Sequence, residues 1–80
     1  MPGEDAISLD GLVIERLSER LVRVELANGH RLIAHAARRD QDRMARVRVG
    51  QRVRLIATPF DLSVGRLEFE QNLENEQLNQ

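Results

Sequence analysis

Several residue types are absent or scarce in this chain. Its 80 residues include no cysteine, tryptophan, tyrosine or lysine, and only two phenylalanines. Without cysteine, neither a disulfide nor a thiolate-bound metal can stabilise the fold, which fits a reducing compartment. Two aromatic residues are too few for the row of exposed rings on which single-stranded nucleic acids stack. No apolar run approaches the roughly 18 residues of a membrane-spanning helix, so we expect no membrane contact.

The length permits one small domain with a modest core. We expect a flexible N-terminal segment over residues 1–6, a folded domain over 7–70, and a disordered, polar and acidic tail over 71–80. Residues 1–5 carry neither the positive charge nor the apolar stretch of a secretory signal. A monomeric, cytoplasmic protein is therefore expected.

Charge is segregated along the chain, although the formal net charge is only -1. Residues 38–54 contain seven arginines and two aspartates, whereas residues 1–19 and 55–80 each contain one arginine and five acidic residues. All 12 basic residues are arginine, whose planar guanidinium binds phosphate through paired donors and stacks on bases. A genome rich in arginine codons would explain the absence of lysine equally well, but it would not explain the clustering.

Apolar residues that alternate with polar ones predict five strands. The expected strands cover residues 7–17, 21–26, 32–35, 52–57 and 66–70. Residues 36–45 contain helix formers and no β-branched side chain, which predicts a short helix. This order is that of an all-β, five-stranded OB-fold barrel with a short helix between strands 3 and 4. Closing the barrel would also remove the exposed sheet edges that promote aggregation.

Turn-forming residues mark where these strands should connect. Asn28-Gly29 predicts a tight hairpin, because both residues tolerate a positive φ. Pro59, Asp61, Ser63 and Gly65 predict a turn before the last strand, and Arg66 would be the first residue of that strand. Gly11, inside the first strand, indicates a bend or a close approach of two backbones. The core is expected to contain the inward-facing residues Val13, Val22, Val24, Leu26, Leu32, Ala34, Val53, Leu55, Ala57, Leu67 and Phe69.

Residues suited to catalysis or metal binding are scarce. Of the three serines, Ser63 falls in the expected turn, where a hydroxyl would cap the backbone. His30 and His35 have no third ligand beside them, so the zinc case is weak. The chain has no glycine-rich phosphate-binding loop. We therefore expect a protein that is not an enzyme and that uses no metal or other cofactor.

The arginine cluster favours RNA as the partner. Five arginines lie in or beside the expected helix: Arg38, Arg39, Arg43, Arg46 and Arg48. Four more alternate with apolar residues on strands and should point outward: Arg23, Arg31, Arg52 and Arg54. A single arginine could merely form a surface ion pair with an acidic residue such as Glu25 or Glu68, but a cluster creates a field that attracts phosphate. Since aromatics are few, folded RNA is favoured, because its phosphates and grooves can be bound without base stacking.

A set of short motifs is distributed over residues 4–70. It comprises Ile7, Gly11, Val13, Arg23-Val24-Glu25-Leu26, Asn28-Gly29-His30, Ala34-His35, Arg46, Gly50, Val53, Pro59-Phe60-Asp61-Leu62-Ser63 and Gly65-Arg66. In combination these motifs resemble the bacterial translation initiation factor 1 family, whose fold is also a five-stranded OB barrel.

The resemblance implies binding to ribosomal RNA at the aminoacyl-tRNA site (A site) of the small ribosomal subunit, beside a ribosomal protein. There the factor would block premature tRNA entry and assist the other initiation factors. Four residues match basic or histidine positions of the family: Arg39, Arg46, Arg66 and His35. Two further arginines, Arg38 and Arg43, would compensate for basic residues that are missing nearby, and Phe60 stands where the family has tyrosine. These seven residues are the predicted RNA-binding set.

The sequence departs from the family pattern where RNA contact is expected. Gln41 replaces an arginine, Asp42 replaces a lysine, and Asp40 adds a second carboxylate that would repel phosphate. Val64 and Glu70 also stand at usually basic positions. We therefore expect weaker and more salt-sensitive subunit binding than for a lysine-rich relative.

A different interpretation remains open at this point. The chain could be a diverged OB-fold paralogue that acts as a protein- or RNA-interaction module outside initiation. In that case the acidic tail over residues 71–80 would dock on a basic partner.

Overall fold

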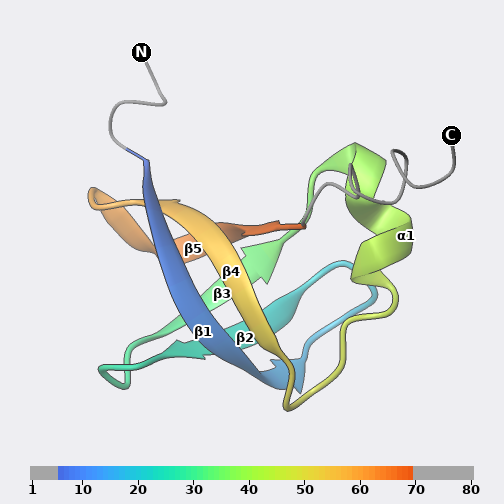
Figure 1. Ribbon diagram of the computed structural model, residues 1–80, viewed down its shortest axis with the longest axis horizontal. Coiled ribbons are helices and arrows are strands. Elements are labelled where there is room, and N and C mark those ends of the chain that lie inside the picture. The colour runs from blue at the N-terminus through green and yellow to red at the C-terminus, as the bar shows by residue number, and fades with distance from the viewer. Residues whose placement is uncertain (1–5, 70–80) are drawn as a thin grey trace, which may run out of the picture.

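Five strands close into a barrel in the computed structural model, which describes residues 6–69 (Figure 1). The strands are β1 Ile7–Arg16, β2 Val22–Leu26, β3 Arg31–His35, β4 Arg52–Thr58 and β5 Asp61–Glu68. Between β3 and β4 the chain forms a 3-10 turn, η2 (Arg38–Asp40), and a one-turn helix, α1 (Gln41–Met44). The predicted all-β, five-stranded barrel with a short helix between strands 3 and 4 is confirmed. The predicted tail, residue 70 and most of the expected N-terminal segment lie outside the described residues.

The order of the strands determines which loops meet. Around the barrel the order is β1-β2-β3-β5-β4, with β4 paired to β1, and only the β3–β5 pair is parallel within residues 6–69. Because β3 and β5 run in the same direction, β5 ends at the end of the barrel where η2 and α1 follow β3. The start of β5 lies at the other end, beside the β2–β3 turn. There the His30 Nε2–H donates a hydrogen bond of 2.8 Å to the carbonyl oxygen of Leu62.

Gly11 lies where β1 is paired on both sides. It is opposite Leu26 of β2 and Val53 of β4. A Cβ atom at this position would overlap the Val24 side chain, which is fully buried, and would lie 3.2 Å from the carbonyl oxygen of Glu25. The close approach of backbones predicted at Gly11 is therefore confirmed.

The β2–β3 hairpin differs in detail from the expected turn. Gly29 has a φ of 88°, whereas no residue other than glycine has a positive φ within residues 6–69. The Gly29 N–H donates to the carbonyl oxygen of Leu26 at 2.9 Å, and Asn28 Oδ1 accepts from the His30 N–H at 3.0 Å. Of the two turn residues only Gly29 uses the left-handed region. Asn28 instead stabilises the turn through its side chain, as in hairpins where a type I turn precedes a glycine.

The prediction for the last strand was wrong in its start. β5 begins at Asp61, opposite Thr58, so Ser63 and Gly65 lie in the strand rather than in a turn, and Arg66 does not open it. The Ser63 hydroxyl does not cap the backbone but donates to Asp61 Oδ1, which also accepts from the Ser63 N–H at 3.1 Å. These hydrogen bonds, first that from the hydroxyl and then that from the backbone, hold the pKa of the Asp61 carboxyl below its ordinary value of 3.8.

The core contains the expected strand residues and three more. Eight predicted residues are buried: Val13, Val22, Val24, Leu32, Ala34, Leu55, Ala57 and Leu67. Leu26, Val53 and Phe69 are partly buried and pack against that cluster. The residues that the sequence analysis missed are Ala36, Met44 and Val47, all in the connection between β3 and β4. Their burial fixes the segment around α1 against the barrel.

Replacing Gly11 by alanine is expected to destabilise the fold by about 1–3 kcal/mol, since the added methyl group would overlap the β-branched, buried side chain of Val24. Urea unfolding followed by circular dichroism measures the loss. Ser8→Ala, at an exposed position of the same strand, is the control and should stay within about 0.5 kcal/mol of wild type. A Gly11→Ala variant as stable as the control would contradict the close approach.

Replacing Ser63 by alanine is expected to raise the pKa of Asp61 toward 3.8, because the hydroxyl supplies the largest lowering effect. A carboxyl whose pKa is lower in the folded state stabilises the fold above its unfolded pKa, and this contribution disappears as the pH falls through the folded pKa. Wild type should therefore lose more stability than Ser63→Ala as the pH falls below about 4. NMR titration of the Asp61 carboxyl tests the shift, and identical pKa values in both proteins would refute it.

Candidate nucleic-acid interface

Residues 38–48, which we call the arginine loop, are held against the barrel by buried apolar side chains. Met44 and Val47 are 0% and 3% exposed, so the backbone on either side of them follows the surface of the barrel. Gln41 adds a polar anchor, because its Nε2 donates to the carbonyl oxygens of Ala36 at 3.1 Å and Ala37 at 3.3 Å. The Gln41 side-chain amide is thus hydrogen-bonded to the backbone of the same β3–β4 connection. The arginines between these anchors are left at the surface.

The arginine loop presents a mixed electrostatic surface. Four of its arginines are exposed: Arg38, Arg39, Arg46 and Arg48. Arg43 is half-buried. The Asp40 carboxylate lies between two of these side chains, 3.9 Å from Arg39 Nε and 3.6 Å from Arg43 Nη1. Its side chain is only 13% exposed, so solvent screens these pairs less than it would screen fully exposed ones. Asp40 therefore neutralises part of the charge that the loop could offer to phosphate.

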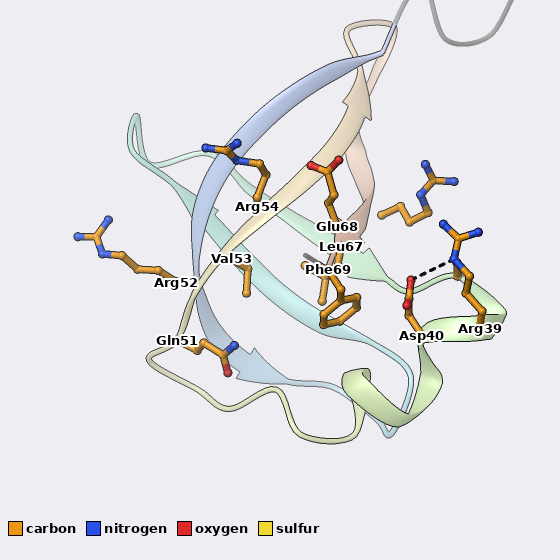
Figure 2. Close-up of a pocket in the computed structure, with 11 residues that line it drawn as sticks. Arg39, Asp40, Gln51, Arg52, Val53, Arg54, Leu67, Glu68 and Phe69 are labelled. Atoms are coloured by element: carbon orange, nitrogen blue, oxygen red, sulfur yellow. Dashed lines mark ion pairs between the residues drawn. The ribbon is translucent and has the colours of Figure 1, made fainter. Parts of the chain in front are cut away.

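An open groove of about 740 Å³ lies between η2 and the strands β4 and β5. Val53, Leu67 and Phe69 give it an apolar lining, and four arginines contribute to its walls: Arg39, Arg52, Arg54 and Arg66. Figure 2 shows Arg52 and Arg54 on one side of the groove and Arg39 with Asp40 on the other, with Leu67 and Phe69 between them. Two carboxylates, those of Asp40 and Glu68, also line the groove, but the four arginines outnumber them. Arg39 belongs to both the arginine loop and the groove, so the two form one continuous surface whose net charge is basic.

Ion pairs reduce the availability of some strand arginines. Arg54 Nε lies 3.1 Å from Asp10 Oδ1, and Arg31 Nε lies 3.1 Å from Glu25 Oε2. Arg23, expected to point outward, is partly buried and pairs with Glu15 at 3.1 Å. Arg52 and Arg66 form no ion pair within residues 6–69. The two guanidinium groups best placed to bind an anion in the groove are therefore those of Arg52 and Arg66.

The structure brings together six of the seven predicted RNA-binding residues. His35 and Arg66 are opposite each other in the β3–β5 pair, both exposed, at the end of the barrel that carries the arginine loop with Arg38, Arg39, Arg43 and Arg46. Phe60 lies between β4 and β5 at the opposite end of the barrel and is 80% exposed. Its part in RNA binding stays a prediction, and it would require a contact separate from that of the other six.

Sequence reasoning missed the groove itself. Arg52 and Arg54 were expected only to point outward, and Phe69 was expected in the core, yet all three line the groove. The alternation of arginine with apolar residues on β4 indicated that these arginines point outward. It could not show which strand or turn forms the other wall of the groove.

Among residues 6–69 no group of three or more histidine, cysteine, aspartate or glutamate side chains could hold a metal ion. In the same part of the chain, no helix has the length and apolar character needed to cross a membrane.

Comparison with known proteins supports the fold. No protein-family model matches the sequence. Among solved structures, the solution structure of translation initiation factor 1 from the Wolbachia endosymbiont (strain TRS) of Brugia malayi matches with a TM-score of 0.66 at 21% sequence identity. The match covers 96% of this chain and 92% of that protein. The chain therefore shares the five-stranded barrel fold of translation initiation factor 1.

Proposed function

We propose that the protein is an RNA-binding translation initiation factor that binds ribosomal RNA at the A site of the small ribosomal subunit, without catalysis. In that position it would block premature tRNA entry and assist the other initiation factors, with a neighbouring ribosomal protein as a further contact. Such a factor would act as a monomer in the cytoplasm. The observation that carries the proposal is the continuous basic surface formed by the arginine loop and the groove, on a barrel that shares the fold of translation initiation factor 1.

The chemistry of this surface suits a folded RNA. Exposed guanidinium groups at Arg38, Arg46 and Arg52 can each bind a phosphate or the edge of a base through parallel N–H donors. Phe69, the one aromatic ring in the groove, is partly buried, so a row of stacked bases has no platform there. Binding of this kind releases counterions, and each phosphate contact should contribute about 0.7 to 0.9 to the slope of log affinity against log salt.

Reversing the charge of Arg39 and Arg46 together is expected to abolish co-sedimentation with purified small ribosomal subunits at moderate salt. The substitutions Arg39→Glu and Arg46→Glu remove two phosphate-binding groups and add two repulsive charges to an exposed surface. The control is the double replacement by lysine, which keeps the charge and should retain most of the binding while it loses the paired donors. Unchanged subunit binding by the double glutamate variant would refute the proposal.

Replacing Asp40 by asparagine is expected to tighten binding to the small subunit by about three- to tenfold, because the ion pairs that Asp40 forms with Arg39 and Arg43 are lost and a charge that repels phosphate is removed. Asp42→Asn is the matched control, since Asp42 is exposed and forms no ion pair within residues 6–69. It removes the same charge and should have a smaller effect. Filter binding at several salt concentrations distinguishes the two variants, and equal gains would show that contact between Asp40 and the arginines is irrelevant.

A further inference from the structure

Arg16, the last residue of β1, connects two segments that are distant in sequence. Its Nη2 donates to the carbonyl oxygen of Met44 at 2.9 Å and to that of Val47. Its Nη1 donates to the carbonyl oxygens of Ser18 at 3.1 Å and Glu19 at 3.3 Å. One half-buried guanidinium therefore ties the β1–β2 turn to the end of α1.

The two acceptors that Arg16 Nη2 holds lie where α1 ends: Met44 is the last residue of α1, and Val47 follows three residues later. The Met44 carbonyl oxygen also accepts from the Val47 N–H, so Arg16 adds a second donor to it. A charged donor makes a stronger hydrogen bond to such a carbonyl than a neutral one. Two acceptors held by one nitrogen, and two more by the other, require the planar fork of arginine rather than the point charge of lysine.

Arg46 lies between the two carbonyls that Arg16 holds. Its own N–H donates to the Arg43 carbonyl oxygen at 3.0 Å, and the Val47 N–H donates to that of Met44 at 3.1 Å. The Arg46 side chain is exposed, so the direction in which it projects from the surface depends on the backbone between Met44 and Val47, whose carbonyls Arg16 binds. Arg16 is itself half-buried and uses its two terminal nitrogens for four hydrogen bonds within the chain.

We propose that Arg16 is a positioning residue for RNA binding: it holds the arginine loop so that Arg46 is directed at RNA, and it does not contact RNA itself. The inference rests on the proposed function. It adds a determinant that lies outside the exposed basic surface and belongs to a different strand.

The test compares Arg16→Ala and Arg16→Lys with Arg20→Ala. The control removes one positive charge from the neighbouring turn, where Arg20 is exposed and forms no ion pair within residues 6–69. Hydrogen exchange at the Arg46 and Val47 amides should accelerate about tenfold or more in both Arg16 variants, with the amides of β4 unchanged. Arg20→Ala should leave exchange at these amides as in wild type.

Binding to purified small ribosomal subunits supplies the second readout. Arg16→Ala should weaken it about three- to tenfold, because the loop must then be ordered on binding. The slope of log affinity against log salt should stay as in wild type, since no phosphate contact is removed. In an Arg46→Ala background, the effect of Arg16→Ala should disappear, because Arg16 acts through Arg46. Should Arg16→Ala fail to fold, Arg16→Lys in both backgrounds carries the same test.

Several outcomes overturn the inference. A salt slope reduced by about 0.7 to 0.9 in Arg16→Ala would mean that Arg16 contacts phosphate directly. Additive effects of the Arg16 and Arg46 substitutions, or unchanged exchange at the loop amides, would also refute the positioning role. If wild type binds the small subunit and Arg16→Ala binds it equally well, only this inference is overturned. Absence of wild-type binding overturns the proposed function, and this inference with it.

Discussion

Closure of the barrel depends on β1 pairing with both β2 and β4. β1 pairs with β4 from Ile7 to Leu12 and with β2 from Gly11 onward, so Gly11 and Leu12 are paired on both sides. The missing Cβ of Gly11 lets the β1 backbone approach Val24 closely enough for both pairings. Once the barrel is closed, the parallel β3–β5 pair brings the end of β5 beside η2, and the groove forms there. The positions of the arginines at this end therefore follow from closure.

The structure sorts the arginines by their partners, which the net charge of -1 does not reveal. Within the described residues 6–69, Arg16 donates to four backbone carbonyls, whereas five other arginines are in ion pairs: Arg23, Arg31, Arg39, Arg43 and Arg54. The exposed pairs, Arg23–Glu15, Arg31–Glu25 and Arg54–Asp10, contribute only about 0–1 kcal/mol each to stability. Their larger effect is on recognition, because a guanidinium already facing a carboxylate has less attraction left for phosphate. Asp40 matters most in this respect, since it faces two arginines of the same loop.

The sequence allowed the strands and most of the core to be predicted, because alternation is a local property that each strand carries in its own residues. The start of β5 was misread because Asp61, Ser63 and Gly65 are turn-forming residues. In the barrel, Asp61 accepts hydrogen bonds from Ser63, and Gly65 is packed against Leu55. Met44 and Val47 were missed because their burial depends on where the loop folds back. The arginine cluster was visible from the sequence, but the groove and the Asp40 pairs depend on the packing of distant segments.

The pairing of β5 with both β3 and β4 has a consequence for how the chain reaches its folded state. Until the C-terminal strand is available, β3 and β4 each keep an open edge with unpaired N–H and carbonyl groups, and Leu32 and Leu55 lack the cover of Leu67. A shortened chain without β5 would therefore expose two unpaired strand edges that promote aggregation, rather than form a smaller stable domain. During synthesis, this barrel is completed only when nearly all of its described residues have left the ribosome.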